Sequence, residues 1–185
     1  MKKLGLVLLA MLVTVSFGFA QADIGLKAVG GKVGFVMPED PIDNTIGLGV
    51  VVDLGTITPD IALQAHVDYW GKTYKAGYYE WTFSEILIGA TAKYYLPGSG
   101  PMKFYGGGGI DFIIASSKGK YTGPQDYWGY DTDVSDSDTE IGFHVLGGLD
   151  YPFSESMTGF AELKYTLNGV DFFSISAGVK FQMGK

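Results

Sequence analysis

Hydrophobic and polar residues alternate with a period of two along most of the chain. In residues 44–55, Ile46, Leu48 and three further aliphatic side chains share one face of an extended segment. The same alternation, interrupted by Gly, Pro, Asp and Asn, predicts strands rather than helices. The eight expected strands are residues 24–36, 44–55, 60–71, 84–95, 102–115, 140–151, 157–167 and 172–181.

The first of these strands changes phase at Gly30-Gly31. A β-bulge at this position would restore the alternation, and we expect one there. Lys27 and Lys32 would then share the polar face. The apolar face would carry Ile24, Leu26, Ala28, Val33 and Phe35.

The connections between the expected strands differ in length. Short turns at residues 55–59, 97–101 and 152–155 follow the second, fourth and sixth strands, and longer connections span residues 37–43, 72–83 and 116–139. An up-and-down meander must close on itself or leave two exposed edges. The sequence therefore predicts an all-β fold, an eight-stranded antiparallel up-and-down barrel with its short turns at one end.

Residues 1–22 have the three parts of a secretory signal peptide. Lys2 and Lys3 precede an uncharged apolar run at residues 4–20, and Ala20-Gln21-Ala22 fits the small-residue cleavage site. The apolar run is short for a transmembrane helix and no stop-transfer sequence follows it. We expect cleavage after Ala22 and a single exported domain at residues 23–185, with a retained anchor helix as the alternative.

The amino-acid composition excludes several classes of protein. The chain has no cysteine, which excludes a disulfide scaffold or a cysteine-based zinc site. Its 13 basic residues face 20 acidic ones, so the formal charge is -7 and nucleic acid is not expected as a partner. The run Gly106–Gly109 lacks the Lys-Ser/Thr pair of a phosphate loop, and we interpret it as permitting close approach of side chains.

The polar face decides which side of the barrel points inward. It is rich in Gly, Ser, Thr and Ala with charges of both signs, as a narrow lumen filled by paired side chains requires. A soluble lipocalin-like ligand-binding barrel, with the faces reversed, is the alternative. The expected polar network in the lumen comprises His66, Asp68, Glu85, Lys93, Lys103, Asp111, Glu140, His144, Glu162 and Lys164.

Aromatic residues on the apolar face gather towards the strand ends. Two such bands are expected where a barrel crosses the two interfaces of a bilayer. The band at the short-turn end comprises Tyr94, Phe104, Tyr151 and Phe181, and the other comprises Tyr69, Phe112, Phe143, Tyr165 and Phe173. These bands predict a transmembrane barrel in a bacterial outer membrane, with membrane lipid as its partner.

The last expected strand, Phe173-Ser174-Ile175-Ser176-Ala177-Gly178-Val179-Lys180-Phe181, resembles the C-terminal assembly signal of outer-membrane barrels. With the strand pattern, it makes the chain similar to the small barrels of OmpX, OmpW and OmpA-domain type, the outer membrane protein beta-barrel domain family. The tail at residues 182–185 departs from the family, which usually ends on the aromatic residue. The resemblance implies insertion by the outer-membrane assembly machinery, and we expect a monomer.

No catalytic arrangement is visible in the sequence. His66 and His144 lie on the polar face, and neither has a Ser two residues away as in lipid-A deacylases. We therefore expect a non-catalytic protein without a cofactor, in a structural or surface-interaction role. The resemblance to OmpW-type barrels leaves an alternative, a conduit for small hydrophobic solutes with an apolar pocket near Trp70, Leu87 and Leu146.

The longest connection combines acidic and aromatic residues that suit contact with an extracellular partner. Its candidate residues are Tyr121, Asp126, Tyr127, Trp128, Tyr130, Asp131 and Asp133. Asp131-x-Asp133-x-Ser135 begins like a calcium-binding EF-hand loop. Asp136 stands where that loop needs glycine and Gly142 where it needs glutamate, so no metal site is predicted.

Overall fold

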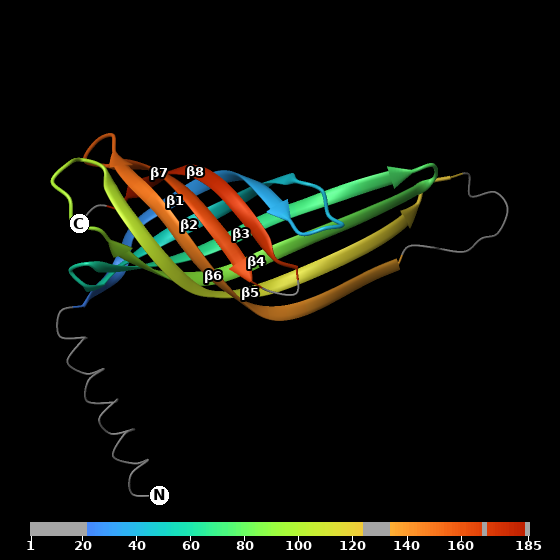
Figure 1. Ribbon diagram of the computed structural model, residues 1–185, viewed down its shortest axis with the longest axis horizontal. Coiled ribbons are helices and arrows are strands. Elements are labelled where there is room, and N and C mark those ends of the chain that lie inside the picture. Colours follow the sequence, from blue (N-terminus) through green and yellow to red (C-terminus); the bar gives the residue numbers. More distant parts are fainter. Residues whose placement is uncertain (1–21, 124–133, 168–169, 184–185) are drawn as a thin grey trace, which may run out of the picture.

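The computed structural model describes residues 22–123, 134–167 and 170–183. These residues form a closed barrel in which neighbouring strands are antiparallel and β8 pairs with β1 (Figure 1), so the predicted fold is confirmed. No helix in the described ranges is long and apolar enough to span a membrane. The strands are β1 (Asp23–Pro38), β2 (Thr45–Thr58), β3 (Ile61–Ala76), β4 (Tyr79–Tyr95), β5 (Lys103–Tyr121), β6 (Val134–Pro152), β7 (Met157–Leu167) and β8 (Phe172–Gln182).

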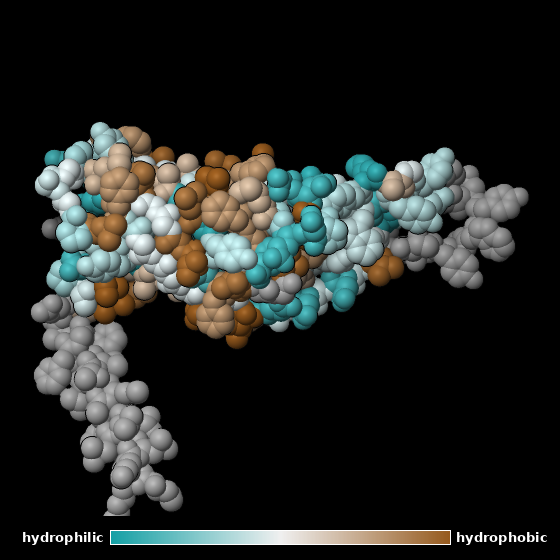
Figure 2. All heavy atoms as spheres, viewed as in Figure 1, coloured by the Kyte–Doolittle hydropathy of each residue, from teal (hydrophilic) through white to brown (hydrophobic). Residues whose placement is uncertain are grey.

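The apolar face of the barrel points outward. Ile46 and Ile141 are 66% and 69% exposed, whereas the Lys93 side chain on the polar face is buried. Figure 2 shows apolar residues around the barrel on the left and mainly hydrophilic residues towards the right. This orientation is the reverse of what a soluble ligand-binding barrel needs, and the lipocalin-like alternative is therefore wrong.

Strands β3 to β6 extend furthest beyond the lengths that the hydropathy pattern predicts. Strands β3 to β6 continue beyond the ends of the others (Figure 1), and the expected connection at residues 72–83 is mostly strand, with a turn at Gly77-Tyr78. Gly77 has φ +60°, a backbone conformation that favours glycine. Likewise, β5 extends to Tyr121 and β6 begins at Val134, inside the expected connection at residues 116–139.

The hydropathy pattern underestimates these strands because hydropathy alternates along a strand only where its two faces have different surroundings. The apolar belt of such a barrel is about 25 Å tall, and beyond it both faces of a strand meet water. The hydrogen-bond ladder continues although the apolar pattern ends. We call this part the protruding sheet, defined as residues 71–76, 79–84, 115–121 and 134–142.

The bulge predicted at Gly30-Gly31 is wrong. Both glycines keep regular partners on β2 and β8, and the irregularity lies between Ile24 and Ala28. Ala28 is consequently buried on the inward face instead of lying with the apolar residues outside. A Cβ atom at Gly30 would collide with the Val179 carbonyl oxygen, so this glycine allows β8 to approach closely.

Candidate functional site in the barrel interior

The barrel interior near the short turns holds a buried lysine between two carboxylates. Lys180 Nζ lies 2.9 Å from Asp53 Oδ2 and 2.9 Å from Asp150 Oδ2. The Tyr95 hydroxyl donates a hydrogen bond of 2.8 Å to the same Asp150 oxygen. These contacts tie β2, β4, β6 and β8 together across the lumen, and they compensate charges that would be costly to bury alone.

A second group of charges fills the next level of the lumen. Lys32 Nζ is 3.1 Å from Asp68 and 3.6 Å from Glu162. Lys93 reaches Glu162 at 3.2 Å, and Lys164 reaches Asp68 at 2.8 Å. The five side chains come from β1, β3, β4 and β7, so each carboxylate joins strands that are distant in sequence.

Two histidines share one aspartate at the centre of the barrel. Asp111 Oδ1 lies 2.8 Å from His66 Nε2, and Asp111 Oδ2 lies 2.8 Å from His144 Nδ1. The other nitrogen of His144 is 2.9 Å from the Thr91 hydroxyl. Sequence reasoning missed Thr91, because only the register of β4 and β6 on either side of Gly109 brings it to His144. Its inward position in the strand alternation was the available signal.

The order Thr91, His144, Asp111 has the connectivity of a nucleophile, a base and an orienting acid. All three side chains are buried, and Thr91 lines neither the cavity beside the apolar cluster nor the one at the short-turn mouth, both described below. A substrate therefore has no route to the hydroxyl from these cavities. The three side chains form a buried hydrogen-bonded network.

The same centre has the composition of a metal site. The ligand atoms of His66, Asp111 and His144 lie within 4.8 Å of one another, a spacing that a divalent cation can use. Both carboxylate oxygens, however, already contact the imidazoles at hydrogen-bond distance. The Lys164 ammonium is also 3.5 Å from His66 Nε2, and its positive charge opposes a cation there.

Two glycines make room for the imidazole rings. A Cβ atom at Gly89 would collide with the Asp111 carboxylate and the His66 ring, and one at Gly109 would collide with the His144 ring. Gly109 belongs to the run Gly106–Gly109, for which the sequence predicted close approach of side chains. Within this run, Gly109 is the glycine that gives the His144 ring its space.

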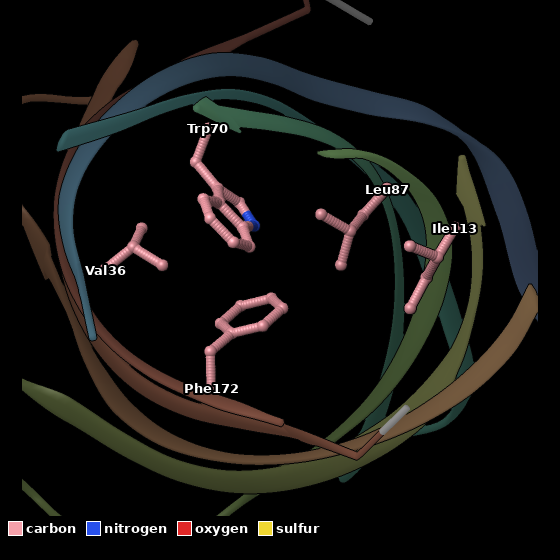
Figure 3. Close-up of a cluster of buried hydrophobic side chains, with 5 residues drawn as sticks. All are labelled: Val36, Trp70, Leu87, Ile113 and Phe172. Atoms are coloured by element: carbon pink, nitrogen blue, oxygen red, sulfur yellow. The ribbon is translucent and has the colours of Figure 1, made fainter. Parts of the chain in front are cut away.

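An apolar plug closes the lumen above the polar network. It consists of Val36, Trp70, Leu87, Ile113 and Phe172, which converge on the barrel axis in Figure 3. The Trp70 and Phe172 rings are 5.5 Å apart, and the adjoining cavity has a volume of only about 30 Å³. Of the three residues expected around an apolar pocket, Trp70 and Leu87 meet in this plug, and Leu146 lies outside it.

The structure places nearly all of the expected network residues inside the barrel. Glu85 is buried, and Glu140 is half-buried on the inward face of β6. The expectation for Lys103 is wrong, because this residue stands at the start of β5, where the lumen opens to solvent. It is exposed and lines a mouth cavity of about 540 Å³, whose lining also includes Asp150 and Lys180.

The predicted interface aromatics occupy the outward face. Tyr69, Tyr94, Phe104, Phe112, Phe143, Tyr151 and Phe181 are exposed on that face. Tyr165 and Phe173 are half-buried and stand opposite each other on β7 and β8. Of the predicted partner-contact residues, Tyr121 packs against Tyr79 with ring centroids 5.2 Å apart. Asp126, Tyr127, Trp128, Tyr130, Asp131 and Asp133 lie outside the described residues.

Solved structures of small outer-membrane barrels are similar to this fold. The neisserial surface protein NspA is 21% identical, with a TM-score of 0.62 over 85% of this chain and 97% of NspA. Ail, the attachment invasion locus protein of Yersinia pestis, solved with the heparin analogue sucrose octasulfate, is 13% identical with a TM-score of 0.57 over 85% and 97%. The N-terminal barrel domain of Pseudomonas aeruginosa OprF is 16% identical, with a TM-score of 0.51 over 86% and 99%.

These identities are low, so the structural similarity establishes the fold alone. No curated protein sequence matches the chain at a significant level. The sequence profile of one family, described as outer membrane protein beta-barrel domain, matches residues 5–183. The chain therefore belongs to the outer membrane protein beta-barrel domain family, and it is a protein of the bacterial outer membrane.

Proposed function

We propose that the protein is a non-catalytic surface-interaction protein, in which the barrel is the membrane anchor and the protruding sheet contacts a partner outside the cell. The observation that carries this proposal is the continuation of β3 to β6 past the apolar belt as one hydrogen-bonded sheet. In outer-membrane barrels the short turns face the periplasm. The protruding sheet, at the opposite end, would therefore stand outside the cell.

The sheet has two edges to offer a partner. Pairing between β2 and β3 ends at Trp70, and pairing between β6 and β7 begins at Phe143. Beyond these residues, the described strands leave one side of residues 71–76 and of residues 134–142 without a neighbouring strand. Backbone groups on a free edge can hydrogen-bond to an extended segment of another protein.

The filled lumen supports an anchoring role over a transport role. Eight strands enclose only enough space for side chains, and here the charged network and the apolar plug occupy that space. The conduit alternative requires these side chains to move apart. We therefore expect the purified protein to give no steady conductance in a planar bilayer, and a conductance carried by small solutes would favour the conduit.

The names of two similar proteins agree with a surface role. NspA is a surface protein, and Ail is an attachment protein whose structure holds a sulfated heparin analogue. This chain carries a formal charge of -7, so a sulfated ligand is not the one that its charge favours. The partner of this chain would differ in charge from that ligand.

Cysteine labelling of intact cells tests the proposal, because the natural chain contains no cysteine. Thr73→Cys places a thiol on an exposed position of the protruding sheet, and Ser99→Cys places one in an exposed short turn. A membrane-impermeant maleimide should label the first variant in intact cells and the second only after the outer membrane is permeabilised. Labelling of Ser99→Cys alone in intact cells would overturn the proposal.

A further inference from the structure

The inner face of the protruding sheet, which we call the trough, carries aromatic side chains on β4 and acidic side chains on β6. It lies above the apolar plug and follows β5, whose inward side chains are small. At Ser117 the cross-strand register places Phe83 of β4 on one side of the floor and Asp136 of β6 on the other. Ala115 lies between Glu85 and Asp138, and Gly119 lies between Trp81 and Val134. The floor is Ala115, Ser117 and Gly119, the aromatic wall is Trp81 and Phe83, and the acidic wall is Asp136 and Asp138, with Glu140 at its base.

The register defines these neighbours directly. Ser117 stands opposite Phe83 on β4 and opposite Asp136 on β6, so the three side chains form one row across the sheet. Such directly opposed residues have Cβ atoms about 4.5–5.5 Å apart. In the next row outward, the Trp81 ring leans over Gly119, where an added Cβ atom would lie 3.5 Å from the ring.

The acidic wall is available to a ligand. Asp136 and Asp138 are exposed, and within the described part of the chain neither has an ion-pair partner. Lys118 and Lys120 alternate with the floor residues of β5 and therefore point to the opposite, outer face of the sheet. The trough face itself carries one lysine, Lys72, which stands opposite Phe83. The carboxylates of this face outnumber that lysine, so the trough face is the negative one.

The aromatic wall adds a second kind of attraction for a cation. Trp81 is 55% exposed, so much of its side chain is accessible to a ligand. An ammonium or guanidinium group over an indole is stabilised by the ring quadrupole, and its aliphatic stem can pack on the same ring. A ligand that fits both walls therefore carries positive charges on apolar stems, as lysine and arginine side chains do.

We propose that this trough binds an extended, basic segment of another protein, in which lysine or arginine recurs at every second residue. This inference deepens the proposed function and rests on it. Successive side chains on one face of a strand are about 6.5–7 Å apart, so Asp136, Asp138 and Glu140 have the spacing of alternate residues in an extended peptide. Among the described residues no strand pairs with the β7 side of residues 134–142, and this edge of β6 offers the backbone of such a segment hydrogen bonds beside the acidic wall.

The test is a titration of the full chain, inserted in nanodiscs of phosphatidylcholine, with a fluorescent (Lys-Ser)4 peptide. We expect saturable binding that weakens as salt is added, and no binding of a (Glu-Ser)4 peptide. The double variant D136N/D138N should weaken binding at least tenfold, and Trp81→Ala should weaken it about threefold.

A matched control distinguishes an effect of the trough on binding from an effect of the protein's net charge. The double variant D60N/E155Q removes two exposed carboxylates in the short turns, and it should bind the peptide like the natural chain. Equal losses of peptide binding in the two double variants would overturn the inference. Spermidine that competes as effectively as the unlabelled (Lys-Ser)4 peptide at the same concentration of positive charge would overturn it as well. If Thr73→Cys is labelled in intact cells and the peptide does not bind, this inference fails and the proposed function stands.

Discussion

The membrane-embedded barrel and the protruding sheet are built from the same four strands, β3 to β6, yet their side chains follow different rules. In the barrel, apolar residues such as Ile88 and Ile110 face outward and charged residues face a filled lumen. In the protruding sheet both faces carry polar residues, and the inner face is an open trough. The difference shows that alternating hydropathy reports the two surroundings of a strand, whereas the hydrogen-bond ladder does not depend on them.

The two regions should also respond differently to loss of charge. A buried charge in the lumen depends on its partners, because removing one leaves the others uncompensated. A charge on the protruding sheet is solvated, so its ion pairs contribute little to stability. Equivalent substitutions in the two regions therefore test whether the distinction is energetic as well as geometric.

The largest expected effect is that of Asp111→Ala at the centre of the barrel. This change removes the shared acceptor of both histidines and one of the carboxylate charges near Lys164, which keeps its ion pair with Asp68. We expect the free energy of unfolding in lipid vesicles, measured by urea titration, to fall by about 3–5 kcal/mol. Asp136→Ala in the protruding sheet is the control and should change it by less than about 0.5 kcal/mol. Similar losses of unfolding free energy in the two variants would show that the lumen depends on its charges no more than the protruding sheet does.

A smaller effect is expected from an added methyl group beside the histidines. Gly109→Ala would place a Cβ atom against the Ala90 carbonyl oxygen and the His144 ring, so the unfolding free energy should fall by about 1–3 kcal/mol. Gly106→Ala, three residues earlier on the exposed face of β5, meets no atom closer than 4.0 Å. The same urea titration should leave this second variant close to the natural chain. A larger loss for Gly106→Ala would contradict the packing argument.

The smallest effect is expected at a surface ion pair of the protruding sheet. Lys75 Nζ lies 2.6 Å from Glu80 Oε1, on adjacent strands and exposed to solvent. Glu80→Gln should lower the unfolding free energy by less than about 1 kcal/mol, and added salt should reduce the difference further. A loss as large as that of Asp111→Ala would mean that the sheet depends on its charges as the lumen does.

Several features of the fold were predictable because they depend on local pattern. The ladder of β2 and the inward position of His66, Lys93 and Glu162 follow from alternation alone. The pattern failed at the outer ends of β3 to β6, where the outward face carries polar residues such as Thr73 and Thr82. It also misplaced Lys103, because a strand's first residue lies at the rim, where an inward side chain still reaches water.

The candidate sites were less predictable than the fold. Alternation identified His144 and Asp111 as inward residues but gave no distance between them, since β5 and β6 pair through a register that the sequence does not state. Thr91 was missed for the same reason. The trough combines Trp81, Ser117 and Asp136 from three strands, and the sequence showed only that each lay in a connection.

The sequence by itself determined a cysteine-free, acidic, all-β chain of eight strands whose apolar face alternates with a polar one, since these properties depend on residue types and a period of two. Only the tertiary structure decided which charges meet, where the lumen is plugged, and which strands continue beyond the membrane. These depend on closure of the barrel and on cross-strand register. Both bring together residues that are distant in the chain, and no local pattern encodes their separation.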